Sequence, residues 1–139
     1  MSVKNFVGAL KAAESTTKST GEGGKIEALT GLDVTAQRLM KEALDPYRVF
    51  GVKKFTDPKS YSQTDPESVD FVFDTLDGLA DRQITGNAAR DAVTDMLSKF
   101  TEESAKYVRR IVLKDLKAGF SESTLNKIYP YLVPVFDVM

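Results

Sequence analysis

Four positively charged residues in the last third of the sequence could act together as a binding surface for anions. They are spaced by 4, 4 and 3 positions, at Lys106, Arg110, Lys114 and Lys117. Residues at these spacings are neighbours on one side of an α-helix, so the pattern predicts a basic stripe. The alternative interpretation is a solvated face on an ordinary amphipathic helix.

A glycine turn and a second helix start are predicted directly after the stripe. Gly119 stands where a helix-ending αL residue is expected, and Ser121 can cap a following helix. The N-terminus of a helix presents backbone N–H groups without intrahelical partners, which suit anions such as phosphates. A row of anion sites at this spacing indicates contact with a nucleic-acid backbone.

Two amphipathic helices within residues 101–131 must position these groups. Thr101 is the predicted N-cap of the first helix, and two glutamates follow it where the helix dipole favours acids. The apolar positions of this helix recur every three or four residues and define a core face: Ala105, Val108, Ile111, Val112 and Leu116. The second helix continues the pattern at Leu125, Ile128 and Leu132.

The remainder of the chain also predicts helices. Amphipathic helices are expected over residues 3–13, 24–29 and 33–44, from Asp65 onward, and from Thr85 or Asn87 to Phe100. Asp65-Pro66-Glu67 has the order typical of a helix start: a capping aspartate, a proline and an acid. Residues 52–55 predict a short extended segment with two outward lysines. With no run of alternating strands, we expect an all-α fold, a compact single domain over residues 1–139 with six or seven helices and short loops.

Composition narrows the classes of function. The chain has 139 residues, a formal net charge of −1, no cysteine and no histidine, which excludes thiol chemistry, zinc–thiolate sites and histidine acid–base catalysis. Charge is nevertheless polarised, with seven basic and four acidic residues over 99–127 but eight acidic and two basic residues over 65–95. Such local patches decide binding more than the net charge does. No apolar run is long enough to span a membrane, and we expect a cytoplasmic location without membrane contact.

Two further motifs could carry chemistry. The glycines before Lys25 resemble a phosphate loop, but Ile26 follows the lysine where that loop needs serine or threonine. Four aspartates line one face of the helix that starts near Asp65, at Asp70, Asp74, Asp77 and Asp81. They could bind a hard cation, but without a shaped loop such a row is typical of a solvated acidic face.

Two stretches of the sequence carry a resemblance to a known family. Arg82–Val93 (RQITGNAARDAV) and Tyr107–Pro134 (YVRRIVLKDLKAGFSESTLNKIYPYLVP) resemble the N-terminal DNA-binding domain of ATP-dependent DNA ligases of T-even-type bacteriophages. They are more distantly similar to the helical DNA-binding domain of eukaryotic and archaeal ligases. Val52-Lys53-Lys54-Phe55 also resembles a family segment, whereas the first 45 residues match loosely.

The resemblance implies a helical domain that grips nicked duplex DNA across the minor groove, through contacts to the sugar-phosphate backbone. It places such contacts on the turn that begins at Lys114, and it makes the helix start at Thr85-Gly86-Asn87 a second clamp. One of the arginines at 109 and 110 can instead serve as a structural ion-pair partner. The full set of predicted DNA-contacting residues is Lys114, Lys117, Gly119, Ser121, Ser123, Thr85, Gly86, Asn87, Lys127 and Arg110.

The same resemblance bears on catalysis and partners. Ligation in this family begins at the lysine of a K-x-D-G motif, and the nearest match here, at residues 75–78, has threonine in its place. We therefore expect this chain to bind DNA without joining it and without a cofactor of its own. ATP and magnesium are expected only for a full-length ligase. The expected partners are double-stranded, nicked DNA and the remainder of a ligase in cis or in trans, with the chain itself a monomer.

A second hypothesis from a different class is a small phage-like adaptor that binds proteins rather than DNA. Its contacts would be the four-aspartate face and the apolar tail, Leu132–Met139.

Overall fold

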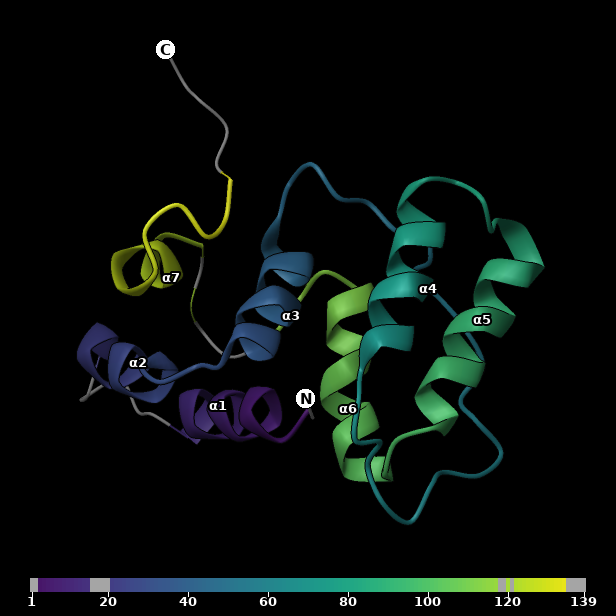
Figure 1. Ribbon diagram of the computed structural model, residues 1–139, viewed down its shortest axis with the longest axis horizontal. Helices are drawn as coiled ribbons and strands as arrows, with labels where there is room; N and C mark the ends of the chain where they lie inside the picture. The colour runs from purple at the N-terminus through teal and green to yellow at the C-terminus, as the bar shows by residue number, and fades with distance from the viewer. Residues whose placement is uncertain (1–2, 16–20, 118–119, 121, 135–139) are drawn as a thin grey trace.

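The computed structural model describes residues 3–15, 21–117, 120 and 122–134. Within these residues the chain forms seven helices and no strand, which confirms the expected all-α fold (Figure 1). The helices are α1 (Lys4–Ser15), α2 (Gly21–Leu29), α3 (Val34–Leu44), α4 (Asp70–Ala80), α5 (Gly86–Ser98), α6 (Glu102–Val112) and α7 (Glu122–Ile128). No helix in the described part of the chain is long and apolar enough to cross a membrane.

Helix α6 is the element around which the others pack. It contacts α1, α3 and α5 and lies between a group formed by α1, α2, α3 and α7 and a pair formed by α4 and α5 (Figure 1). Seven of its eleven residues are buried, including every predicted core position within the helix. Its predicted N-cap is confirmed, because the Thr101 hydroxyl accepts a hydrogen bond from the Ser104 N–H at 3.2 Å.

The helix start predicted at Asp65-Pro66-Glu67 is wrong, because α4 begins at Asp70. Asp65 serves α6 instead. One carboxylate oxygen accepts from the Thr101 N–H at 3.0 Å and the other accepts from the Ser104 hydroxyl at 2.6 Å. A capping aspartate looks the same in sequence whether it caps the next helix or one 36 residues later, and here the distant helix uses it.

The end of α6 also differs from the prediction. The helix was expected to continue to a glycine turn at Gly119, but it ends at Val112, and Lys114 adopts a positive φ of 60°. The Asp115 N–H donates to Arg110 O at 3.0 Å and the Lys114 N–H donates to Ile111 O at 3.1 Å, which is the pattern of a Schellman motif. A lysine therefore takes the αL position usually given to glycine. Gly119 and Ser121 lie outside the described residues.

The predicted pairing of α6 and α7 across a tight turn is therefore wrong. Helix α7 packs against α2, on the far side of α3 from α5 (Figure 1). The Tyr129 hydroxyl anchors the segment after α7 to the α2–α3 connection, accepting from the Leu32 N–H at 2.8 Å and donating to Leu29 O at 2.7 Å. The end of α6 and the start of α7 were predicted to form one DNA site, and in the structure they are separated.

Several helix ends meet at one end of the molecule. Helices α4 and α6 run in one direction and α5 runs in the other, so the start of α5 lies at the same end as the C-terminal ends of α3, α4 and α6 (Figure 1). Contacts between loops confirm this arrangement, since Lys114 reaches the end of α3 and Arg48, just after α3, reaches Asp77 in α4. We call this the upper end of the molecule and the opposite end, where α6 begins, the lower end.

Candidate nucleic-acid interface

Lys114, the first residue of the predicted contact turn, points into the protein. Its Nζ donates to Glu42 O at 2.8 Å and to Asp45 O at 2.6 Å, two carbonyls at the C-terminal end of α3. The side chain is half-buried, and burial lowers its pKa from the ordinary value of 10.5. Its position satisfies carbonyls that α3 leaves without intrahelical partners. Lys114 is thus a cap on α3.

Arg110 is an internal residue too, only 8% exposed. Its guanidinium makes an ion pair with Glu14 at the end of α1, donates from Nη1 to Leu116 O at 3.0 Å and lies 4.6 Å from the centre of the Tyr107 ring. Glu14 also accepts from the Tyr107 hydroxyl at 3.2 Å. Arg110 thereby joins α1 to α6 and to the segment after it.

The predicted basic stripe is therefore wrong as a surface. Lys106 and Lys117 are exposed, but Arg110 lies inside and the last two cations follow the end of α6. The three spacings fit a longer helix than the one that forms, because α6 ends at Val112. An arginine or lysine at a helical spacing can equally reach buried carboxylates and carbonyls, which local sequence does not reveal.

Replacing Lys114 with methionine should lower the free energy of unfolding by about 1–3 kcal/mol, because Glu42 O loses its Lys114 donor and Asp45 O keeps only the Arg48 N–H. The loss should grow with alkaline pH. Since the folded-state pKa of Lys114 lies below 10.5, the unfolded chain binds more protons between the two values, and the stability contributed by this site rises with pH across that window.

Urea unfolding of the wild type and Lys114→Met at neutral pH, pH 9 and pH 10.5 would measure this difference. Tyrosine ionisation affects both proteins equally, so it cancels in the difference between their free energies of unfolding. Equal stabilities, or a difference that narrows toward pH 10.5, would contradict the role assigned to Lys114.

The other predicted contacts fall into two separate groups. Ser123 and Lys127 are exposed on α7, and Lys117 is exposed beyond the end of α6 with a φ of 54°. Thr85, Gly86 and Asn87 lie at the start of α5, on the opposite side of the molecule from α7 (Figure 1). The structure does not bring these groups together.

The start of α5 has the features expected of an anion site. Thr85, Gly86 and Asn87 are all exposed, and Thr85 is the N-cap but makes no side-chain capping hydrogen bond. Gly86 has a φ of 60°, where residues with a Cβ are strained, and nothing in the described structure lies within 4 Å of the position a Cβ would take. A phosphate could therefore approach the backbone closely, at the positive end of the α5 dipole.

Four exposed cations accompany this helix start. The Arg82 guanidinium occupies the space where a side chain at Gly51 would begin, which joins the turn before α5 to the chain segment after α3. That segment then runs beside α5, because the Thr94 hydroxyl donates to Thr56 O at 2.6 Å. One turn before Thr94, the Arg90 guanidinium lies 3.3 Å from Asn87 Oδ1. We call these cations, together with the α5 start, the upper cationic band: Lys53, Lys54, Arg82 and Arg90.

Sequence reasoning placed two members of this band in an acidic region and so missed them. Arg82 and Arg90 are the only cations over residues 65–95, where acids dominate the count. Exposed acids also lie beside the band, since Asp81 precedes Arg82 and Asp91 follows Arg90, whereas Asp77 pairs with another cation: Arg48 donates to Asp77 at 2.7 Å. The sequence signal that could have identified Arg82 and Arg90 was their position on either side of a predicted helix start.

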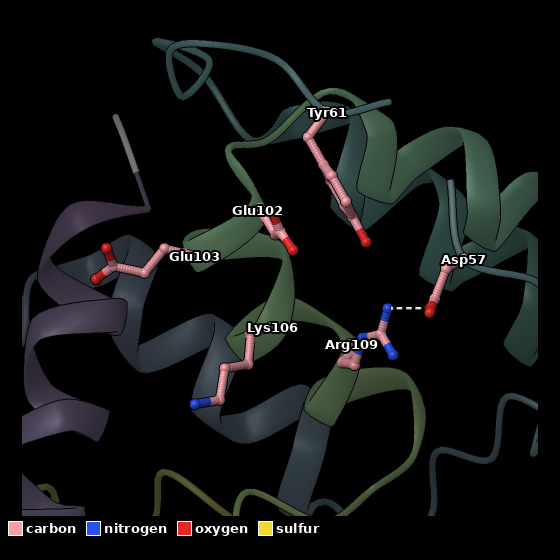
Figure 2. Close-up of a pocket in the computed structure, with 6 residues that line it drawn as sticks. All are labelled: Asp57, Tyr61, Glu102, Glu103, Lys106 and Arg109. Carbon is pink, nitrogen blue, oxygen red and sulfur yellow. Dashed lines mark hydrogen bonds and ion pairs between the residues drawn. The ribbon is translucent and has the colours of Figure 1, made fainter. Parts of the chain in front are cut away.

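A hollow in the described part of the chain lies beside α6, not at the band. It has a volume of about 600 Å³ and is lined by Asp57, Tyr61, Glu102, Glu103, Lys106 and Arg109. Figure 2 shows Arg109 directed at Asp57, with which it forms an ion pair, while Lys106 and Glu103 point away from that pair. Glu103 is also paired with Lys11. Three of the lining residues are acidic and the arginine is already paired, so the hollow does not favour an anion.

No group suited to hold a metal ion occurs within the described ranges, judged by clusters of three or more histidine, cysteine, aspartate or glutamate residues. The three aspartates of α4 and its C-cap Asp81 are exposed, as predicted for a solvated face, and Asp77 is engaged by Arg48.

Comparisons with known proteins agree with the sequence resemblance. Residues 26–129 match the family described as DNA ligase N terminus. The DNA ligases of Enterobacteria phages T4 and T6 are each 33% identical over 88 residues, which is 60% of this chain but 18% of theirs.

Two solved structures are also similar. The one titled Pmar-Lig_PreS3 aligns over 94% of this chain and 32% of its own length, with a TM-score of 0.76 and 31% identity. Pmar-Lig_Pre. aligns over 88% and 29%, with a TM-score of 0.74 and 30% identity. The chain thus spans under a fifth of the phage ligases and about a third of the solved chains.

Proposed function

The chain belongs to the DNA ligase N-terminal family, and from that premise we propose that it is a sequence-independent, duplex-binding domain of an ATP-dependent DNA ligase. The observation that carries the proposal is the upper cationic band. Exposed Arg82 and Arg90 flank the α5 start in sequence, and exposed Lys53 and Lys54 follow the segment that Arg82 contacts. The first backbone N–H groups of a helix have no intrahelical partners, which together with these cations suits a row of phosphates.

The chemistry of the band fits backbone contact rather than base readout. Lysine and arginine side chains bind phosphate oxygens, and the amides of the α5 start add donors that are indifferent to sequence. Gly86 allows the closest approach, and Asn87, held beside Arg90, can donate to a sugar or phosphate oxygen. Such contacts fix the position of a duplex without selecting its sequence.

The domain would act by holding a nicked duplex for catalytic residues that lie outside it. The 139 residues contain no K-x-D-G sequence, so we assign the adenylation step, with its ATP and magnesium, to the remainder of a ligase. That remainder is the proposed protein partner.

Fluorescence anisotropy with labelled duplexes of unrelated sequence, over a series of salt concentrations, tests the proposal. If four cations each neutralise one phosphate, log Kd should rise with log salt with a slope of about 3–4. Affinities for the different sequences should agree within about threefold, since phosphate contacts carry no sequence information.

Strong discrimination between sequences, or binding that salt leaves unchanged, would contradict a backbone-binding domain. Absence of binding at low salt to both nicked and intact duplexes would favour the adaptor hypothesis instead.

A further inference from the structure

Two acids bound the cations that flank the α5 start. The order along the chain is Asp81-Arg82, then the helix start at residues 85–87, then Arg90-Asp91, with both cations inside and both acids outside. All four of these charged side chains are exposed. The positive charge around the helix start therefore has negative charge directly beyond it in both directions along the chain.

These two acids have no cation of their own. Among the ion pairs of the described residues, none includes Asp81 or Asp91. By contrast, the acid one turn before Asp81 pairs with Arg48, and the acid one turn after Asp91 pairs with Lys99. The two acids that adjoin the cations of the band are thus the ones whose charge no ion pair offsets.

The residues at 81 and 82 are both unfavourable for the local fold. Asp81 is the C-cap of α4, where the negative end of the helix dipole repels a carboxylate. Arg82 has a φ of 61° in a Schellman motif, because its N–H donates to Leu79 O at 3.3 Å and the Gln83 N–H donates to Gly78 O at 2.9 Å. A residue with a Cβ adopts this conformation at a cost. An acid that opposes the fold, beside a cation held in a costly conformation, indicates a role outside folding.

Asp91 lies one turn along α5 from Asn87, as Arg90 does. Positions three and four residues apart are neighbours on a helix surface, so Asn87 has a cation on one side and an acid on the other. The cation is the one that bonds it, since the Arg90 guanidinium lies 3.3 Å from Asn87 Oδ1. The first turn of α5 contains no acid. A phosphate at the helix start therefore meets donors and cations, whereas a phosphate bound further along α5 would meet Asp91.

We propose that Asp81 and Asp91 restrict the upper cationic band to duplex DNA, by repelling the additional phosphates that a single strand would place beside it. This inference rests on the proposed function and assigns residues that determine its specificity. A duplex is stiff and its backbone curves away from a protein surface, so few of its phosphates reach the band. A single strand is flexible, follows a cationic surface closely and would bring further phosphates against the two acids. Discrimination between binding partners commonly depends on such a repulsive element.

Removing both acids should relax this discrimination. In water, a negative charge about 7 Å from a phosphate weakens binding by roughly a factor of three, and screening is weak at about 0.01 M salt. Asp81→Asn combined with Asp91→Asn should therefore bind a single strand about tenfold more tightly at this salt concentration, while its affinity for a duplex should change by less than about threefold. Fluorescence anisotropy with a labelled duplex and with one of its own strands measures both Kd values, and their ratio is the test.

Two control variants separate charge from shape and position. Asp81→Glu with Asp91→Glu keeps both charges and should discriminate as the wild type does. Asp70→Asn with Asp74→Asn removes the same charge from exposed positions nearer the start of α4 and should leave the ratio unchanged. Urea unfolding should show Asp81→Asn to be at least as stable as the wild type, because the change relieves repulsion at the C-terminal end of α4.

The outcomes separate this inference from the function on which it rests. A lower preference for duplex in the asparagine variant at 81 and 91, and in neither control, is the expected result. If the wild type binds neither form of DNA, the proposed function fails. If the wild type binds duplex but does not prefer it to the single strand, or the asparagine variant keeps the wild-type ratio, the role of Asp81 and Asp91 is overturned and the duplex-binding function stands. An equal change in the Asp70→Asn with Asp74→Asn control would also overturn it, because net charge would then set the preference.

Discussion

Neutralising the upper cationic band should reduce the affinity for duplex DNA about ten-thousandfold at 0.1 M salt. Each phosphate contact contributes roughly a factor of ten under these conditions through the release of condensed counterions. The variant replaces Lys53 and Lys54 with alanine and Arg82 and Arg90 with glutamine. All four side chains are exposed, and circular dichroism would confirm that the variant, which also loses the Arg82 contact with Gly51, retains its helices. The slope of log Kd against log salt should also fall by about one for each contact removed.

The matched control removes the same number of positive charges from the lower end. All four lysines are exposed: Lys4 and Lys106 lie near the start of α6, Lys99 is the C-cap of α5, and Lys59 stands in sequence between Asp57 and Tyr61, which line the hollow beside α6. Their replacement with alanine should change affinity by less than about tenfold, because distant charges are screened at this salt concentration. If both quadruple variants lose affinity equally, net charge rather than the band controls binding.

Replacing Arg110 with alanine should lower the free energy of unfolding by about 3–5 kcal/mol, a large part of the stability of a small domain. The change leaves the Glu14 carboxylate without its cation and Leu116 O without its donor, and it opens space beside the Tyr107 ring. Urea unfolding followed by circular dichroism would measure it.

The neighbouring arginine provides the control. Arg109 pairs with Asp57 at the surface, where the two side chains are 29% and 65% exposed, and its Nε is buried without a hydrogen-bond partner. Arg109→Ala should therefore cost no more than about 1 kcal/mol. A stable Arg110→Ala variant that loses duplex affinity would restore Arg110 as a DNA contact and contradict the structural role.

Apolar periodicity predicted most of this fold. The predicted core face of α6 is buried and its cap at Thr101 is confirmed, and α3 and α5 form where helices were predicted. These features depend on neighbours in sequence, which is why the sequence is sufficient to predict them. The α2 start at Gly21, three residues before the predicted one, is an ordinary boundary difference.

The predictions that the structure contradicts concern polar residues whose partners are distant in sequence. Asp65 caps a helix 36 residues away, Arg110 pairs with Glu14 across 96 residues, and Lys114 binds carbonyls about 70 residues earlier. For a charged residue at a helical spacing, the sequence does not show whether the side chain contacts solvent, a ligand or the protein interior. The early end of α6 also involves distant partners. The contacts of Lys114 with α3 accompany an αL conformation at Lys114, although lysine has no intrinsic preference for that conformation.

The candidate interface was therefore predicted in part. The helix start at Thr85-Gly86-Asn87 and the exposed lysines at 53 and 54 are where sequence placed them, and both remain proposed contacts. Their association with Arg82 and Arg90 depends on how the α4–α5 turn meets the segment after α3, which only the three-dimensional structure shows.

The most direct test of the account is a titration of the ¹⁵N-labelled chain with a short nicked duplex, followed through its amide NMR shifts. We expect the largest shifts within residues 47–54 and 82–90, at the upper end, with small shifts in α1 and α7. Shifts concentrated in residues 117–127, with the start of α5 unchanged, would contradict the upper cationic band as the site that binds DNA.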